Sequence, residues 1–148
     1  MSLVSKALEY ASVKHRGQND DQGRPYFFAH IIQVYNILNV VSRDESVLCA
    51  GILHDVIEDT GAGYEDLVRE FSQEVADLVV ELTYVGSKES GRYFPVLHSR
   101  RAIIVKFADR LSNISRMDDW PGDWQLDYLN ESRFWDTASN SAPCEKKA

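Results

Sequence analysis

The sequence lacks the features that would direct a protein into a membrane or stabilise it with disulfide bonds. No apolar run approaches the roughly 18 residues that span a bilayer, and residues 1–6 do not have the layout of a signal peptide. Only two cysteines occur, Cys49 and Cys144, which are too few for a disulfide framework. These absences predict a cytoplasmic protein in a reducing compartment, without a membrane partner.

The chain also lacks an excess of positive charge. Its 148 residues carry a formal net charge of −7, whereas a general nucleic-acid-binding protein presents a basic face. We therefore expect no nucleic-acid partner. A small phosphorylated substrate stays compatible with the composition, because a bound divalent cation can invert the local field inside an acidic protein.

A third absence is that of alternating, strand-like patterns of useful length. The apolar residues recur at helical spacing, which predicts an all-α fold: a single compact domain over residues 1–135 and a flexible tail over 136–148. Helices are expected over residues 3–14, 30–41, 64–71, 74–82, 102–117 and 124–135. A further, central helix is expected to begin after an N-cap at Ser42 or Asp44.

The most informative stretch that is present spans residues 47–60. Seven small or apolar residues lead into His54-Asp55, and Glu58-Asp59 follow. Unpaired charge inside a protein is costly, so a buried helix that runs into four ionisable residues needs partners for them. Read as one continuous helix, the stretch places each member of the first pair above one of the second, because residues four apart share a face. We expect a metal ion held by His54 and Asp55, with two carboxylates one turn further on.

A second informative stretch is the helix expected over residues 102–117. Asp109 lies there among apolar residues, and Asn113 shares its face four residues later. The expected core stripe consists of Ile103, Ile104, Phe107, Leu111 and Ile114. In the last expected helix, Tyr128 and Leu129 are expected to face inward.

Other polar and aromatic groups have simpler interpretations. The single histidines His15 and His98 are expected to be structural or exposed. The aromatic patch is expected to be core rather than a platform for a base: Tyr26, Phe27 and Phe28. One basic neighbourhood is either a solvated surface or a phosphate-facing lid: Lys88, Arg92, Arg100 and Arg101.

Three motifs together resemble a known family. Residues 23–30 read Gly-Arg-Pro-Tyr-Phe-Phe-Ala-His, residues 53–60 read Leu-His-Asp-Val-Ile-Glu-Asp-Thr, and residues 105–113 read Val-Lys-Phe-Ala-Asp-Arg-Leu-Ser-Asn. Their order resembles the HD-domain metal-dependent phosphohydrolases, and in particular the hydrolase domain of the RelA/SpoT alarmone enzymes. In size the chain is similar to the single-domain, Mesh1-like hydrolases, and the resemblance extends over residues 7–135.

This resemblance implies a divalent metal ion, usually manganese in the family, with four ligands: His30, His54, Asp55 and Asp109. Mixed imidazole and carboxylate ligands also suit other divalent ions, and four of them leave positions open for water and substrate. The resemblance further implies that Glu58 and Asp59 position or deprotonate the attacking water. It implies nucleotide contacts for Asn113 and Tyr128. The implied reaction removes the 3′-pyrophosphate from ppGpp or pppGpp, giving GDP or GTP.

The chain departs from the family pattern at several positions. Ile31 replaces a proline after the first metal histidine, and the spacing from Pro25 to His30 is one residue longer than usual. Asp20 replaces a basic residue that helps to hold the base, and Ser112 replaces a histidine. None of these changes removes a metal ligand, so hydrolysis remains the expectation while the choice of nucleotide stays open.

Three functions therefore remain. The first is a (p)ppGpp pyrophosphohydrolase, and the second is an HD hydrolase acting on another phosphoester, such as a nucleoside monophosphate or NADPH. The third is a non-catalytic metal-binding regulatory module, which Glu58 and Asp59 argue against because a binder has no need of them. The chain ends soon after the hydrolase-like region, so no alarmone synthesis is expected. The sequence leaves open whether the chain forms a homo-oligomer.

Overall fold

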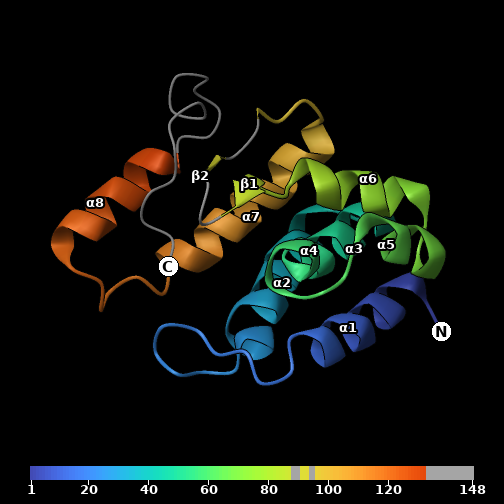
Figure 1. The fold of residues 1–148 in the computed structure, drawn as a ribbon, viewed down its shortest axis with the longest axis horizontal. Coiled ribbons are helices and arrows are strands. Elements are labelled where there is room, and N and C mark those ends of the chain that lie inside the picture. Colours follow the sequence, from blue (N-terminus) through green and yellow to red (C-terminus); the bar gives the residue numbers. More distant parts are fainter. Residues whose placement is uncertain (88–90, 94–95, 133–148) are drawn as a thin grey trace.

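Helix α3 (Glu45–Leu53) lies at the centre of a helical body, and four other helices pack around it (Figure 1). The structure is a computed structural model, and it describes residues 1–87, 91–93 and 96–132. In chain order, the other elements are α1 (Leu3–Lys14), the π-helical turn η1 (Phe27–Ile31), α2 (Ile32–Val41), α4 (Val56–Asp59), α5 (Tyr64–Glu70), α6 (Gln73–Glu81), β1 (Val85–Ser87), β2 (Gly91–Tyr93), α7 (Arg100–Ile114) and α8 (Gly122–Glu131).

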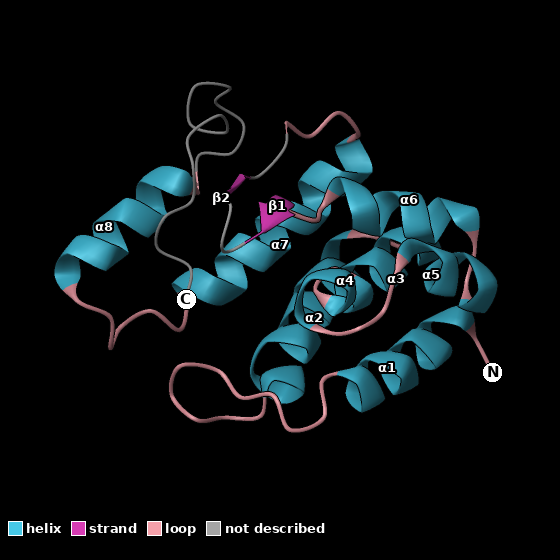
Figure 2. Ribbon diagram, in the orientation of Figure 1, coloured by secondary structure: helices cyan, strands magenta, loops and turns pink. Residues whose placement is uncertain are grey.

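Helices dominate the described residues, which confirms the all-α prediction (Figure 2). The prediction of a tail over residues 136–148 falls outside the described part of the chain. Within that part, no helix combines the length and the apolar character that a bilayer-spanning segment requires.

The burial of α3 follows from its sequence. All residues from Val47 to Leu53 are buried, and α1, α2, α6 and α7 pack against them. A helix that is apolar on every side must be covered on every side. Of the two N-caps proposed for this helix, Asp44 is confirmed, because its carboxylate accepts hydrogen bonds from the amides of Ser46 (3.0 Å) and Val47 (3.4 Å).

Gly51 marks the tightest contact in this core. A Cβ atom added there would lie 2.2 Å from Cδ1 of Leu38 in α2, whose side chain is fully buried. Gly51→Ala is therefore expected to lower the free energy of unfolding by about 1–3 kcal/mol, although alanine favours a helix by about 1 kcal/mol. Urea denaturation measures the change. Gly122→Ala, where nothing lies within 4 Å of the added atom, is the matched control. Equal stability of the two variants would contradict the expectation.

The segment after Pro25 begins to coil earlier than residue 30, the start predicted from the sequence. Its first turn is π-helical, since the Ile32 amide donates to the Phe27 carbonyl five residues back. A π-turn accommodates one residue more than an α-turn and often occurs at functional sites. The chain has one residue more than the family pattern between Pro25 and His30, and this turn absorbs it. His30 lies in this turn and is fully buried.

The prediction of one continuous helix through residues 47–60 is wrong. Helix α3 ends at Leu53, a turn holds His54 and Asp55, and α4 is a separate short helix. The Asp59 amide still donates to the Asp55 carbonyl (2.9 Å), so these two residues remain one turn apart. The break matters because adjacent residues on a regular helix point apart, whereas His54 and Asp55 here face the same point.

Helix α7 exposes three of the five residues of the predicted core stripe, whereas Ile103 and Ile114 are half-buried and Ile103 packs against the core. The exposed fractions are 40% for Ile104, 44% for Phe107 and 54% for Leu111, so these three predictions are wrong. Four of the residues that α7 buries are small or β-branched, Ala102, Val105, Ala108 and Ser112, and three are charged, Lys106, Asp109 and Arg110. Small side chains let α7 approach α2 and α3 closely, which places its polar face beside the turn at His54. In α8, the inward position of Tyr128 is confirmed, but Leu129 is 43% exposed.

Two further segments differ from the prediction or refine it. The sequence shows no strand-like pattern of useful length, but β1 pairs antiparallel with β2 in a short two-stranded ribbon. Arg101 binds Asp44 (2.7 Å) and Glu74 (2.5 Å), and so ties the start of α7 to α3 and α6. These pairings favour the solvated-surface interpretation for Arg101 over a phosphate-facing one.

Candidate metal centre and active site

Four side chains from three separate segments converge on one point. They are His30 of η1, His54 and Asp55 of the turn after α3, and Asp109 of α7. The Nε2 atoms of the two histidines lie 3.2 Å apart. Oδ1 of Asp109 lies 3.0 Å from Nε2 of His30 and 3.2 Å from Nε2 of His54. Oδ2 of Asp55 lies 3.5 Å and 3.1 Å from the same two nitrogens.

The ring of His54 is oriented by the helix end that precedes it. Its Nδ1 lies 2.7 Å from the carbonyl oxygen of Gly51. A carbonyl only accepts, so Nδ1 carries the hydrogen and Nε2 faces the cluster. Burial alone would lower the pKa of His54, but the carboxylates of Asp55 and Asp109 hold this pKa well above its ordinary value. A ligating imidazole must be neutral, so a cation and a proton compete for this Nε2.

A chain of hydrogen bonds orients His30 in the same way. The Ser115 hydroxyl donates to the Ser112 carbonyl (2.7 Å) and therefore accepts from Nε2 of Gln33 (3.1 Å). This turns the amide oxygen of Gln33 toward the Ser112 hydroxyl, which donates to it (2.7 Å). The Ser112 oxygen can then accept from Nδ1 of His30 (2.8 Å), which leaves Nε2 with a free lone pair.

Arg116 opposes this tautomer of His30. Its Nη2 lies 2.8 Å from the same Nδ1 atom, and a guanidinium can only donate. The Ser112 and Arg116 contacts therefore cannot both be hydrogen bonds in one state of the ring. A ligand on Nε2 selects the contact with Ser112.

The two aspartates are held by side chains outside the cluster. The Tyr26 hydroxyl donates to Oδ2 of Asp55 (2.5 Å), and Nζ of Lys106 donates to Oδ2 of Asp109 (3.0 Å). Burial would raise the pKa of both aspartates. However, His54 holds the pKa of Asp55 below its ordinary value, and Lys106 with the histidines holds that of Asp109 well below it. Both carboxylates are therefore ionised.

This arrangement fits a divalent cation. Ligand atoms about 2.1 Å from one metal ion lie about 3.0–3.4 Å from one another, and the nitrogen–oxygen separations in the cluster run from 3.0 to 3.5 Å. Two imidazole lone pairs and two ionised carboxylates are a donor set for divalent metals. The two negative charges also match the charge of such an ion.

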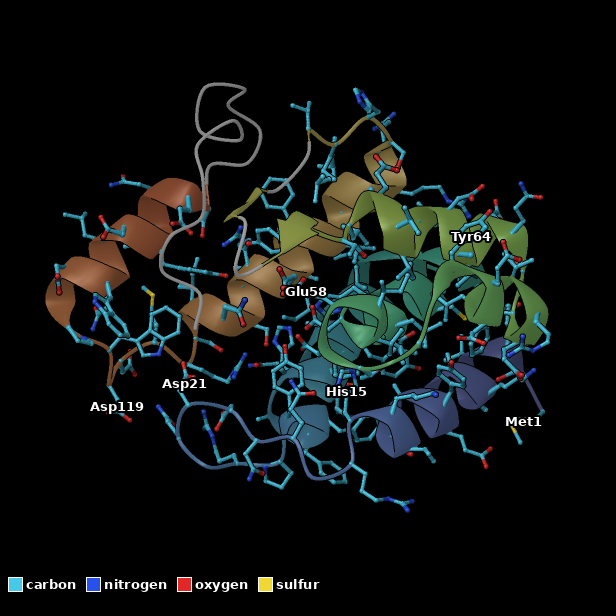
Figure 3. All side chains as sticks on the ribbon, in the orientation of Figure 1. Met1, His15, Asp21, Glu58, Tyr64 and Asp119 are labelled. Carbon is cyan, nitrogen blue, oxygen red and sulfur yellow. The ribbon has the colours of Figure 1, made fainter. Side chains whose placement is uncertain are left out.

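A cavity of about 460 Å³ opens beside the cluster. This volume is in the range of sites that hold small organic ligands. All of the site residues predicted from the sequence line it except His30, which is buried behind the others: His54, Asp55, Glu58, Asp59, Asp109, Asn113 and Tyr128. Figure 3 shows Glu58 on the side of α4 that faces α7.

The predicted nucleotide-contacting residues are also brought together. Nδ2 of Asn113 donates to the Tyr128 hydroxyl (2.7 Å) and lies 3.4 Å from Oδ1 of Asp109. The Tyr128 ring packs edge-on against the Trp120 ring, with 5.4 Å between the ring centroids. The guanidinium carbon of Arg110 lies 4.7 Å from the centroid of the Tyr128 ring. The contact between Asn113 and Tyr128 therefore links α8 to the four-residue His/Asp cluster.

The cavity wall is strongly acidic. Of the described residues that line it, nine are carboxylates, and two, Lys106 and Arg116, carry a permanent positive charge. Burial and the neighbouring carboxylate of Asp55 raise the pKa of Asp59, while a hydrogen bond from Gln18 opposes this rise. An anionic substrate can enter such a wall when a bound cation compensates its charge.

The sequence interpretation did not identify several residues that support this site. Lys106 lies three residues before Asp109, so helical spacing could have indicated it. Tyr26 packs against the core as expected, but it also lines the cavity and its hydroxyl holds Asp55. Phe28, also expected in the core, is 70% exposed. No local signal links Tyr26 to Asp55, because 29 residues separate them.

Comparisons with known proteins agree with this geometry. A family model described as HD domain matches residues 7–133. The chain is 36% identical over 141 residues to guanosine-3′,5′-bis(diphosphate) 3′-pyrophosphohydrolase MESH1 of Drosophila melanogaster. That alignment covers 88% of this chain and 78% of MESH1. The chain is also 35% identical over 130 residues to guanosine-3′,5′-bis(diphosphate) 3′-pyrophosphohydrolase of Borreliella burgdorferi. That alignment covers 80% of this chain but only 19% of the longer relative.

A solved structure gives the same answer for the fold. It is that of a metazoan ortholog of SpoT that hydrolyses ppGpp and has a role in starvation responses, and it matches with a TM-score of 0.77 at 29% sequence identity. The match covers 98% of this chain and 89% of the other. Since the family model matches most of the chain, and MESH1 is similar over most of its own length, this protein belongs to the HD-domain family.

Proposed function

We propose that this protein is a cytoplasmic, metal-dependent pyrophosphohydrolase that removes the 3′-pyrophosphate from ppGpp or pppGpp, with Mn²⁺ as its metal. One observation carries the proposal: a four-residue His/Asp cluster lies on the wall of a cavity that is also lined by Glu58 and Asp59. A regulatory binder would need the cluster but not the second pair of carboxylates. The named activities of MESH1 and of the Borreliella relative support this substrate.

His30, His54, Asp55 and Asp109 would hold the cation. When bound, a divalent cation lowers the pKa of a water molecule and offsets the negative charge of the phosphate group. The outer contacts from Gly51, Ser112, Tyr26 and Lys106 keep the ligand atoms aimed at one point. Such outer contacts typically change metal affinity by about 10- to 100-fold.

Glu58 and Asp59 would carry the proton transfers. The attacking water gives up a proton as its oxygen bonds to the phosphorus next to the 3′-oxygen. The bond from that phosphorus to the 3′-oxygen breaks, pyrophosphate leaves, and the 3′-oxygen takes a proton. Two carboxylates at the end of α4 can accept the first proton and donate the second. The raised pKa of Asp59 suits a group that exchanges protons.

Asn113 and Tyr128 would position the nucleotide from the part of the cavity wall formed by α7 and α8. Their side chains are hydrogen-bonded to each other, and Asn113 also contacts Asp109. Lys106 lies three residues before Asp109 in α7, and Arg116 lies three residues after Asn113, just beyond the end of that helix; both line the cavity. They would supply positive charge near the phosphate groups. With these contacts the phosphates would lie near the cluster and the base would occupy the outer cavity.

A substrate panel tests the proposal. The purified chain with Mn²⁺ is offered ppGpp, pppGpp, a nucleoside monophosphate and NADPH, and products are separated by ion-exchange chromatography. We expect GDP and pyrophosphate from ppGpp, and GTP and pyrophosphate from pppGpp. Cleavage of another phosphoester with intact ppGpp would replace the proposed substrate, and cleavage of none would favour a regulatory module. Repeating the assay with Mg²⁺ and Zn²⁺ tests the metal.

A further inference from the structure

We infer that Gln18, oriented by His15, positions the carboxylate of Asp59 for proton transfer. The inference rests on the proposed function of Asp59. Nε2 of Gln18 donates to Oδ2 of Asp59 (3.0 Å), and Oε1 of Gln18 lies 2.7 Å from Nδ1 of His15. These three residues come from the end of α1, the loop that follows it and the end of α4. Neither Gln18 nor His15 belongs to the four-residue His/Asp cluster.

The direction of the two hydrogen bonds is determined by chemistry. An ionised carboxylate only accepts, so the amide nitrogen of Gln18 faces Asp59 and the amide oxygen faces His15. The His15 nitrogen that meets this oxygen must then carry a hydrogen. Each residue therefore fixes the orientation of the next, from His15 through Gln18 to Asp59.

His15 is suited to this role because its ring is enclosed. The residue is 2% exposed, and its ring lies 5.4 Å from the ring of Tyr26, which in turn lies 5.2 Å from that of His30. Its Nε2 is buried without a hydrogen-bond partner among the described residues. Buried polar groups are normally hydrogen-bonded. Because Nε2 has no such partner, the contact between Nδ1 and Gln18 is the hydrogen bond that holds this ring among the described residues.

The backbone of Gln18 is also fixed. Gly17 has a φ of 82°, which permits the sharp turn after α1. The Gln18 amide donates to the His15 carbonyl (3.0 Å), and the Gln18 carbonyl accepts from the Tyr26 amide (2.9 Å). With its main chain held on both sides, Gln18 can restrain another side chain. Figure 3 shows His15 at the end of α1 that faces the start of α2.

Asp59 needs such a restraint. It is the last residue of the four-residue helix α4, and its side chain lines the cavity. Burial by the cavity wall and Asp55 disfavour its ionised form, whereas the donor from Gln18 favours that form. Gln18 and His15 are positioning residues, which act through Asp59 rather than on the substrate.

Gln18→Met tests the inference, since methionine keeps the length of the side chain and removes both hydrogen bonds. We expect kcat to fall between about tenfold and a hundredfold, as for a misplaced reacting group, with KM and Mn²⁺ affinity within about twofold of wild type. Gln73→Met, at the exposed first position of α6, is the matched control and should leave kcat unchanged. An unchanged kcat in Gln18→Met would overturn the inference.

A double-mutant cycle shows whether Gln18 acts through Asp59. In an Asp59→Asn background, Gln18→Met is expected to change the residual kcat by less than about twofold. An equal loss in both backgrounds, or a raised KM with normal kcat, would assign Gln18 a direct substrate contact and overturn the inference.

His15 is tested by a matched pair. His15→Leu removes the donor, and His15→Asn places an amide nitrogen near the position of Nδ1. We expect a loss of several-fold in kcat for the leucine variant and substantial recovery for the asparagine variant, with thermal unfolding measured for both. Equal rates in two folded variants would remove His15 from the inference.

A crystal structure of Gln18→Met needs no turnover. We expect the Asp59 carboxylate to move by about 1 Å or more, and an unmoved carboxylate would contradict the inference. This comparison stays informative if the wild-type chain cleaves none of the offered phosphoesters, a result that would contradict the proposed function alone.

Discussion

Replacing Asp109 with asparagine is expected to remove tight Mn²⁺ binding and to lower the rate of phosphoester hydrolysis by at least about a thousandfold. Asp109 is the proposed ligand that joins the two histidines, because one of its oxygens lies 3.0 Å from Nε2 of His30 and 3.2 Å from that of His54. Asparagine keeps the shape but removes the anionic charge that a divalent cation requires. Isothermal titration with Mn²⁺ and steady-state kinetics measure the two effects.

Asp118→Asn is the control for this change. Asp118 is an exposed aspartate just beyond α7 that does not line the cavity. The control variant should bind Mn²⁺ and turn over substrate like the wild type. Circular dichroism of Asp109→Asn should show a folded helical protein. A folded Asp109→Asn variant that keeps its Mn²⁺ affinity would show that the cation binds somewhere other than the four-residue cluster.

The second large effect is expected from the carboxylates of α4. Glu58→Gln and Asp59→Asn should each lower kcat by about 10²- to 10⁴-fold, the usual contribution of a general acid or base. Both residues line the cavity, but neither belongs to the four-residue His/Asp cluster. Metal binding should therefore stay close to that of the wild type while turnover falls.

This separation distinguishes catalysis from metal binding. The measurement pairs kcat with the Mn²⁺ stoichiometry of each purified variant. The Asp118→Asn variant again serves as the control for a lost carboxylate. Turnover at the wild-type rate in both α4 variants would remove the catalytic assignment of this pair and favour a binding role for the cavity.

Local patterns are sufficient to predict much of this protein. The apolar run before His54 predicts a buried central helix, and its N-cap at Asp44 follows from a short-range preference. The ionisable residues after that run predict His54 and Asp55 as part of the cluster that the structure assembles, whereas His30 and Asp109 are predicted from the resemblance to the HD-domain family. Each of these predictions depends on residue type and spacing within one segment, or on the order of motifs along the chain.

Other features depend on how the segments pack. Helix α7 has two stripes of apolar or small residues at helical spacing, and periodicity cannot tell which one faces the core. The structure buries the stripe of small residues because they allow close approach to α2 and α3, and it exposes Ile104 and Leu111. The π-turn at His30 and the break at His54 likewise arise where the chain must aim a side chain at a shared point.

The contacts that orient the site residues are the hardest to predict from the sequence, because they join residues that are far apart along the chain. Tyr26 meets Asp55 across 29 residues, Gln18 meets Asp59 across 41, and Ser112 meets His30 across 82. A sequence specifies which groups can donate and accept at such positions. Which donor reaches which acceptor depends on the relative placement of whole helices, and that placement is decided by the packing of the entire core.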